Sequence, residues 1–300
     1  MDTVIVSRNL PQDDGFAFIR EETLVPGGSA SNLSVAAASL GMSVWQTGKI
    51  GDDLYGKLFR EDLRSQNIND CFLQVKEGGT TLHTYILNAL DGKHCIYANI
   101  GNTVCELLPE ELPRNILDKI DIFYTDMFSG KAAIYLAERA LKEKKTVVYN
   151  MQCTPTFMKE CGTTLDEIEK MLHMCTLFSS GKAGYSEMTG ERNPVRAMEI
   201  IQKRYQIAEG VVCTMGRSGS LWLYNGEVYH ADAFPIKVID TTGAGDCFLA
   251  GLIYAYFMRE MPKPKALRFG NAVAAVKCMQ NNPRLRSNLS EVEEFMRLHP

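Results

Sequence analysis

The sequence contains one stretch whose residue types suit the transfer of a charged group. Residues 240–246 read Asp-Thr-Thr-Gly-Ala-Gly-Asp and lead into an apolar run, Cys247 to Met258, that is predicted to be a helix. Small residues before a helix leave its first backbone N–H groups uncovered, and such groups bind anions. Asp246 is expected on the first turn, where its carboxylate could accept a proton beside that anion. This combination predicts phosphoryl transfer to a hydroxyl group.

The same loop also admits a purely structural interpretation. Its glycines could form a tight turn with Asp246 as a helix cap, because a short glycine pattern is weak evidence on its own. The neighbouring acid and threonine residues favour a functional loop. Asp240 and Thr242 could coordinate a cation through their oxygen atoms, although Thr242 could equally bond to the local backbone.

Two further glycine clusters could contact ligands. Gly27 and Gly28 precede a predicted helix that carries Asn32, so the backbone could approach a hydroxyl-rich substrate while the amide donates and accepts hydrogen bonds. A loop capped by Ser29 would also explain this segment. The third cluster, residues 214–219, follows a predicted strand, and ligands often bind at the carboxyl ends of strands in α/β sheets. A plain turn fits these residues as well.

Common nucleotide-binding motifs are missing from the sequence. It contains no Gly-x-x-x-x-Gly-Lys-[Ser/Thr] loop, no Gly-x-Gly-x-x-Gly fingerprint and no protein-kinase catalytic loop. A hydride-transfer enzyme is therefore disfavoured. If the chain handles ATP, we expect it to do so through another loop.

Composition argues against several other classes of protein. The 300 residues include 32 basic and 36 acidic side chains, and a net charge of −4 disfavours broad nucleic-acid binding. The longest apolar run is too short to cross a bilayer, and the first residues form no signal sequence. The nine cysteines include no Cys-x-x-Cys pair, which favours reduced thiols. We expect a cytoplasmic protein that binds neither nucleic acid nor membrane.

Short β-like runs alternate with amphipathic helical stretches along most of the chain. This alternation predicts βαβ units and a largely parallel sheet that is covered by helices on both faces. The predicted strands are residues 4–6, 43–45, 122–124, 147–149, 177–178 and 211–213. The predicted helices are residues 30–40, 55–65, 131–143, 166–174 and 194–205.

One segment departs from the alternation. Residues 84–87 and 94–97 are both strand-like, and the turn between them contains Asp91-Gly92, which is a strong hairpin signal. A hairpin inside a βα succession suggests a small flap, and Gly78-Gly79 could be its hinge. The sequence has no repeats or long linkers, so we expect one domain over residues 1–300 with this flap attached.

Taken together, these segments resemble the ribokinase-like (PfkB) carbohydrate kinase family. Residues 240–248 are similar to its C-terminal signature, and residues 27–56 are similar to its N-terminal signature. The resemblance extends through residues 80–81, 91–92, 214–219 and 269–272, and so covers nearly the whole chain. It implies a three-layer α/β/α sandwich with a mostly parallel central sheet. It also implies a small β lid at about residues 3–25 and 78–100.

The resemblance implies an ATP-dependent transfer of phosphate to an alcohol group of a sugar, with Mg²⁺ on the phosphates. Asp246 would be the base, and the anion hole would consist of Gly243, Ala244 and Gly245. The substrate would be held by Asp2, Gly27, Gly28 and Asn32, with a further hydroxyl contact from Asp126. The ATP cleft would be lined by Thr214, Gly216, Gly219 and Asn271. Members of the family often pair through their lids, which makes a homodimer plausible.

Three departures from the family pattern are visible. Gly181-Lys182-Ala183-Gly184 stands where an Asn-x-x-Glu motif is usual, which weakens any prediction about metal handling. Asn281-Asn282 stands about where Gly-Ala is common, which leaves a K⁺ site at Asp240 and Thr242 open. The third departure concerns the first core strand, which in the family ends in a substrate-binding Asp.

Asp2 precedes Pro11 by the spacing that the family shows between this Asp and a proline. If Asp2 is the counterpart, the first core strand is expected before Met1. The alternative counterpart is Asp13 or Asp14.

The predicted substrate is a neutral monosaccharide or a similar polyol. Ser29 replaces a lysine that ribokinase has at this point, and residues 150–152 supply no arginine for an acidic or phosphorylated sugar. Two alternatives stay open. One is a nucleoside kinase of the same fold, and the other is a catalytically silent ligand-binding homologue.

Overall fold

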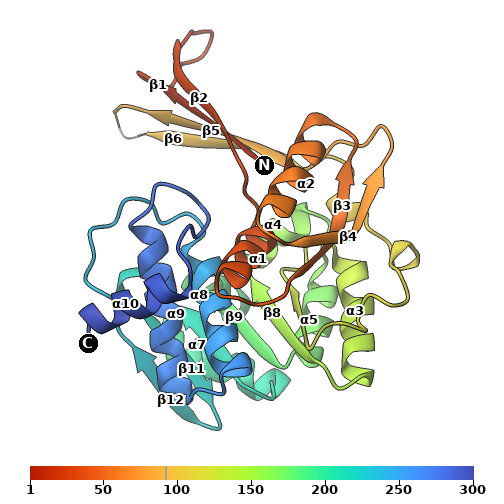
Figure 1. The fold of residues 1–300 in the computed structure, drawn as a ribbon, viewed down its shortest axis with the longest axis vertical. Helices are drawn as coiled ribbons and strands as arrows, with labels where there is room; N and C mark the ends of the chain where they lie inside the picture. Colours follow the sequence, from red (N-terminus) through yellow and green to blue (C-terminus); the bar gives the residue numbers. More distant parts are fainter. Residues whose placement is uncertain (92) are drawn as a thin grey trace.

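A six-stranded sheet forms the centre of the molecule, and most of its strands are the short apolar runs of the sequence. Its order is β12-β11-β10-β9-β8-β7, with β7 to β10 parallel and β11 and β12 antiparallel. The computed structural model describes residues 1–91 and 93–300 (Figure 1). The strands of this sheet are β7 (Ile122–Thr125), β8 (Thr146–Met151), β9 (Leu177–Gly181), β10 (Val211–Thr214), β11 (Ser220–Tyr224) and β12 (Glu227–Ala231).

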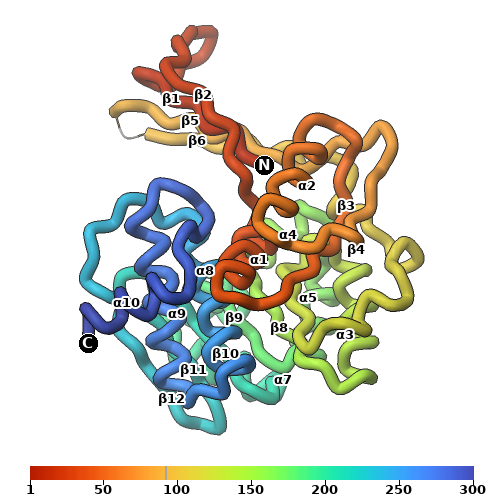
Figure 2. The backbone as a smooth tube through the Cα atoms, viewed as in Figure 1, coloured from red at the N-terminus to blue at the C-terminus, as the bar shows by residue number. Residues whose placement is uncertain are grey.

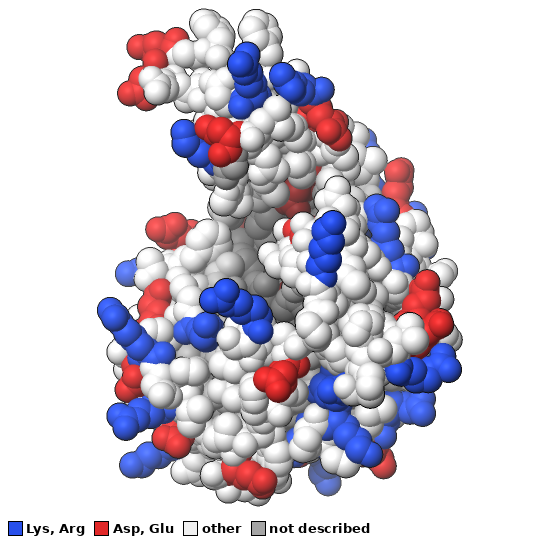
Figure 3. Space-filling model, turned by 90° about the vertical axis from the view of Figure 1, so that its left-hand side faces the viewer, with Lys and Arg blue, Asp and Glu red and all other residues white. Residues whose placement is uncertain are grey.

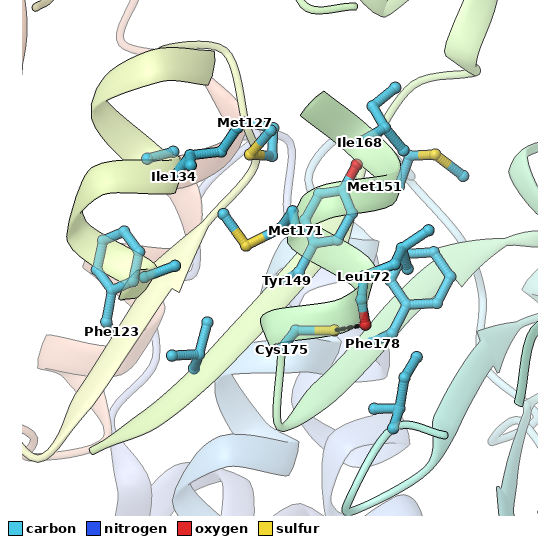
Figure 4. Packing of buried hydrophobic residues seen from close by; sticks show 14 of the residues in the cluster. Phe123, Met127, Ile134, Tyr149, Met151, Ile168, Met171, Leu172, Cys175 and Phe178 are labelled. Atoms are coloured by element: carbon cyan, nitrogen blue, oxygen red, sulfur yellow. Dashed lines mark hydrogen bonds between the residues drawn. The ribbon is translucent and has the colours of Figure 1, made fainter. Parts of the chain in front are cut away.

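Helices cover both faces of this sheet, because its strands are apolar on both sides. Along β8, Val147 and Tyr149 enter one hydrophobic core, whereas Val148 enters the core on the opposite face. The first core packs against α3, α5 and α7, and Figure 4 shows Tyr149 and Phe178 within it. The second core packs against α1, α8, α9 and α10. This is the predicted three-layer α/β/α sandwich with a mostly parallel central sheet.

Helices follow β7, β8, β9 and β12 along the chain, and two more helices precede β7 (Figure 2). Their bounds are α1 (Ser29–Ser39), α2 (Leu54–Ser65), α3 (Gly130–Lys142), α4 (Pro155–Glu160), α5 (Leu165–Met174), α6 (Lys182–Thr189), α7 (Pro194–Tyr205), α8 (Ala244–Ile253), α9 (Lys263–Cys278) and α10 (Leu289–Leu298). Short 3₁₀ turns are η1 (Val104–Glu106), η2 (Pro109–Glu111) and η3 (Gly216–Ser218), and a π-helical turn, η4 (Tyr254–Met258), continues α8. Within the described residues, none of these helices combines the length and the apolar character that a membrane span needs.

A second sheet projects from the body in the order β2-β1-β5-β6 (Figure 1). It contains β1 (Asp2–Ser7), β2 (Ile19–Val25), β5 (His83–Ala89) and β6 (His94–Asn99). The antiparallel pairing of β5 with β6 confirms the predicted hairpin, although Gly92 of its turn lies outside the described residues. At the base of the sheet, the Asp53 carboxylate accepts bonds from the Thr81 N–H at 2.8 Å and the Thr81 hydroxyl at 2.7 Å. We refer to these four strands as the lid sheet.

The third sheet consists only of β3 (Trp45–Gly51) and β4 (Asn69–Lys76), which run parallel. A cavity of about 530 Å³ is lined by residues of β3 and by residues of β7, the edge strand of the central sheet. The prediction that a core strand precedes Met1 concerns residues outside this sequence, and it stays a prediction.

The predicted element bounds agree with the structure to different degrees. The predicted helix at residues 194–205 matches α7, which the Asn193 side chain caps by accepting from two backbone N–H groups. The strand predicted at residues 43–45 is wrong in position, because β3 begins at Trp45 and continues to Gly51. The helix predicted from Cys247 to Met258 begins earlier, at Ala244, and becomes a π turn at Tyr254.

Candidate active site

Asp246 lies in the first turn of α8, where its side chain is almost fully buried (1% exposed). Its Oδ1 accepts a hydrogen bond from the Ser29 hydroxyl at 2.9 Å, and its Oδ2 accepts one from Asn32 Nδ2 at 3.0 Å. Both donors stand in the first turn of α1, which packs against α8. Burial raises the pKa of Asp246 to about 7, and the two hydrogen bonds act in the opposite direction. A carboxyl group with this pKa can accept and release a proton near neutral pH.

The loop before α8 depends on glycine at position 243. Gly243 has a φ of 74°, in the left-handed region that other residues rarely adopt. A Cβ atom at this position would also overlap the carbonyl oxygen of Pro283. No atom lies within 4 Å of the position that a Cβ would take at Gly245, so this side of the loop faces open space.

Free backbone donors surround the entrance to α8. The Ala244 N–H donates to the Thr241 carbonyl at 3.1 Å and closes the turn. In the described part of the chain, the N–H groups of Gly243, Gly245 and Asp246 meet no acceptor. Uncovered N–H groups at the positive end of a helix form an anion site. The uncovered N–H groups lie beside the Asp246 carboxylate, but the Ala244 N–H, which the sequence assigned to the anion hole, is already bonded within the turn. The anion hole itself stays a prediction.

The predicted substrate residues gather around the start of α1. Asp126 follows β7, and its Oδ2 accepts from the Ala30 N–H at 3.2 Å, while burial raises the pKa of this carboxyl. Asp2 begins β1, and its Oδ1 accepts from the Thr84 hydroxyl at 2.6 Å. The Asp2 carboxylate lies where a Cβ atom at Gly27 would be, so a side chain at position 27 would require Asp2 to move. Figure 3 shows a deep hollow between the projecting lid sheet and the body of the molecule.

The predicted nucleotide residues cluster at one end of β10 and β11. Thr214 ends β10, Gly216 begins η3, and Gly219 leads into β11. Asn271 of α9 joins this group, because its Oδ1 accepts from the Ser220 hydroxyl at 3.0 Å. The Asn271 Nδ2 donates to the carbonyl groups of residues 231 and 232 at 2.9 and 3.0 Å. The Asn271 amide therefore ties α9 to the strands around this end of the sheet.

The described residues offer few side chains that could bind Mg²⁺. They contain no group of three acidic, histidine or cysteine side chains arranged to hold a metal ion. Residues 181–184 form the end of β9 and the start of α6, and they supply no carboxylate. Mg²⁺ commonly binds through substrate phosphates and only one or two carboxylates. The site therefore fits an ion that is carried mainly by the phosphates of a nucleotide.

Three residues near the site were missed by reasoning from the sequence. The sequence suggested Ser29 as a possible cap and as the replacement of a lysine, but not the direct contact that its hydroxyl makes with Asp246. Arg284 is buried (5% exposed), and its guanidinium contacts Asp62, Ser31 and Asn32. Lys277 is fully buried and donates to the carbonyl oxygen of Asp240, the first residue of the segment 240–246, which we call the anion loop. The Gly-Gly pair before Ser29 was a usable signal, whereas no motif marks Arg284 or Lys277.

Comparison with known proteins identifies the family. Residues 4–288 match the pfkB family of carbohydrate kinases. The chain is 24% identical to a 5-dehydro-2-deoxygluconokinase of Listeria innocua over 92% of this chain and 86% of the relative. It is 26% identical to an ATP-dependent ribose-1-phosphate kinase of Halopiger xanaduensis, over 98% of this chain and 94% of the relative.

A solved structure agrees with this assignment at the level of the fold. A putative ribokinase II from E. coli, in complex with ATP and Mg²⁺, superposes with a TM-score of 0.84 at 18% identity. The superposition covers 99% of this chain and 96% of the other. The family match spans nearly the whole chain, including the anion loop and Asp246. The chain therefore belongs to the pfkB family of carbohydrate kinases, enzymes that transfer a phosphoryl group to an alcohol group.

Proposed function

We propose that this kinase transfers the γ-phosphate of ATP to a hydroxyl group of a small sugar or polyol, with Asp246 as the general base. The observation that carries the proposal is the buried Asp246 carboxylate beside the uncovered N–H groups at the start of α8. As the hydroxyl oxygen forms its bond to phosphorus, the hydroxyl proton passes to Asp246 and the bond to the ADP oxygen breaks. The N–H groups of Gly243 and Gly245 would stabilise the negative charge on the migrating group.

The residues around the start of α1 would position the acceptor hydroxyl. Asn32 already donates to Asp246, so a sugar bound beside this pair would place a hydroxyl within reach of the base. Asp2 and Asp126 would offer carboxylate oxygens to other hydroxyl groups, and the missing side chain of Gly28 would allow close approach. This set of donors and acceptors supports a ligand rich in hydroxyl groups.

The nucleotide would lie at the end of β10 and β11, against Thr214, Gly216 and Gly219. Nothing lies within 4 Å of the position that a Cβ would take at Gly216, so the backbone there is accessible to a ligand. Asn271 would keep this wall of the cleft in place through its bonds to neighbouring loops. Mg²⁺, bound mainly by the phosphates, would supply charge neutralisation on the triphosphate.

A panel of sugars, polyols and nucleosides, scored by ADP release, tests the substrate class. We expect turnover with a neutral sugar or polyol, because the Asn150 side chain near the end of β8 bonds to Gln152 and residues 150–152 include no arginine. Turnover confined to nucleosides would reject the sugar assignment in favour of a nucleoside kinase. Turnover confined to acidic or phosphorylated sugars would show that a cationic group elsewhere in the site recognises the substrate.

The raised pKa of Asp246 predicts a pH dependence of the reaction. The general base must be ionised, so we expect kcat to fall as the pH decreases through about 7. Ser29→Ala removes a hydrogen bond that lowers the Asp246 pKa, and the acidic limb of the profile should therefore move to higher pH. A profile that is flat through neutral pH, or a limb that moves to lower pH in the variant, would contradict the role of Asp246.

The lid sheet is expected to close over the bound sugar and to carry a homodimer contact. Phe16 and Phe18 are 94% and 90% exposed on the loop between β1 and β2, and Tyr97 of β6 is 65% exposed. Large apolar side chains gathered on one projecting sheet favour a protein contact. Closure of such a lid over the site would exclude water from the transferred phosphoryl group.

Light scattering after size-exclusion chromatography tests the homodimer. We expect a mass of twice 33.5 kDa for the native chain and a shift toward the monomer mass for Phe18→Ser. Phe157→Ser is the control, because Phe157 is also partly exposed (39%) but lies on α4 in the body. A native chain that elutes as a monomer would rule out the lid contact.

A further inference from the structure

Lys277, at the carboxyl end of α9, has its side chain entirely removed from solvent (0% exposed). Its Nζ donates to the carbonyl oxygen of Asp240 at 2.8 Å and lies 3.2 Å from the Asp240 carboxylate oxygen Oδ2. Burial of an ammonium group is costly unless anionic or polar oxygens surround it. The buried Lys277 ammonium finds such oxygens on Asp240.

Asp240 is the residue at which the anion loop begins. Its Oδ1 accepts from the Thr242 N–H at 2.9 Å and from the Thr242 hydroxyl at 2.8 Å. The N–H groups of Ile239 and Asp240 donate to the carbonyl oxygen of Cys278, the neighbour of Lys277. The start of the anion loop is thus fastened to the end of α9 at Lys277 and Cys278. A change in charge at this junction acts on the loop that would hold the phosphoryl group.

The oxygens around Asp240 were the ones predicted from the sequence to hold a monovalent cation. In the structure, Lys277 donates to the carbonyl and the carboxylate of Asp240, and the remaining carboxylate oxygen serves Thr242. A K⁺ ion at Asp240 and Thr242 would compete with the ammonium for the same oxygens and would be repelled by its charge. The residues present therefore do not fit a resident monovalent cation.

We propose that the Lys277 ammonium is a built-in replacement for a monovalent cation, and that it keeps the anion loop in its working shape without K⁺. The inference rests on the proposed kinase reaction, because the loop matters as a phosphoryl-binding element. Lys277 is a positioning residue: its charge neutralises the Asp240 carboxylate next to a site that must receive a polyanion. The same charge acts at Asp246, whose pKa it lowers slightly against the effect of burial.

Thermal unfolding tests the proposal independently of turnover. Lys277→Met keeps most of the length of the side chain but removes its charge, and it takes the donor away from the Asp240 carbonyl oxygen and from Oδ2. We expect the native chain to have the same Tm in potassium chloride and in choline chloride of equal ionic strength. The variant should have a lower Tm in choline chloride, and K⁺ or NH₄⁺ should raise it, because an ion that binds only the folded state stabilises it.

Turnover in the two salts provides the second readout. We expect the native rate to be the same in both, and the Lys277→Met rate to be reduced about tenfold or more in choline chloride and largely restored by K⁺. Lys265→Met is the matched control, because Lys265 lies on α9 but is exposed. It should lose neither stability nor rate, and it should show no response to K⁺.

Several results would overturn the proposal. Activation or stabilisation of the native chain by K⁺ would show that a cation site exists beside Lys277. If Lys277→Met lowers the Tm and the rate and neither K⁺ nor NH₄⁺ restores them, the lysine serves only the packing of the core and does not replace a cation. If the variant does not fold, the native chain is compared in potassium chloride and choline chloride. A change in its Tm or its rate contradicts the proposal, and equal values in both salts support it. If no substrate is turned over, the proposed function fails, while the Tm comparison still decides this inference.

Discussion

Replacement of Asp246 by asparagine is expected to reduce kcat by at least ~10²-fold, because the variant cannot take the proton from the acceptor hydroxyl. The asparagine side chain has nearly the same shape and can still bond to Ser29 and Asn32. Binding of ATP and of sugar should therefore change little. Steady-state kinetics with the best substrate of the panel, together with calorimetric binding of ATP, measure both quantities.

The stability of the same variant separates loss of the base from loss of the fold. Folding raises the pKa of Asp246 from 3.8 to about 7, so above pH 7 the ionised carboxylate favours the unfolded state. This penalty is absent below the unfolded pKa, where the carboxyl is neutral in both states. Asp246→Asn removes it, and its Tm at pH 8 should be no lower than that of the native chain. A stable variant that keeps turnover within about tenfold of the native rate would contradict the role of Asp246 as base.

Gly243→Ala is expected to reduce turnover by roughly 10²-fold or more, because the anion loop cannot keep its shape with a side chain at this position. The added Cβ would overlap the Pro283 carbonyl, and the positive φ would be strained. The N–H groups of the loop would then be displaced from the migrating phosphoryl group. Unlike Asp246→Asn, this variant should also bind ATP more weakly.

Gly190→Ala is the control for backbone strain. Gly190 has a φ of 73°, close to the 74° of Gly243, but it ends α6 and has no atom within 4 Å of its Cβ position. Both variants should lose stability, by roughly 1–2 kcal/mol from strain alone, and only Gly243→Ala should lose turnover beyond the unfolded fraction. Equal kinetic losses in the two variants would show that general destabilisation, and not the anion loop, explains the effect.

The fold was largely predictable where local signals and burial agree. The Asn193-Pro194 start of α7 combines a side-chain cap with a proline in the first turn, and the prediction matches the helix. The runs in β8 and β10 are apolar on both faces because helices cover both sides. By contrast, β3 includes Gln46, Thr47 and Lys49 in a half-buried two-stranded sheet, and no apolar run marks it.

The motif of the candidate site could be predicted from the sequence, but the buried charged residues that pack against the motif could not. The Gly-Ala-Gly-Asp sequence holds the proposed base and anion loop in a single continuous stretch, so both could be proposed from the sequence directly. Lys277 and Arg284 reach the site from distant segments, and their roles depend on packing between α9, the loop after it and α1. Only the folded chain brings these charges to Asp240 and Asn32.

Phosphorus NMR of the reaction mixture tests the central claim most directly. With the native chain, ATP and the best sugar of the panel, we predict that the γ-phosphate signal of ATP declines while a phosphomonoester signal of the sugar grows in equal amount. With Asp246→Asn under the same conditions, both changes should be slowed by at least ~10²-fold. Growth of inorganic phosphate in place of the sugar phosphate, or equal rates for the two proteins, would contradict phosphoryl transfer to a hydroxyl group with Asp246 as its base.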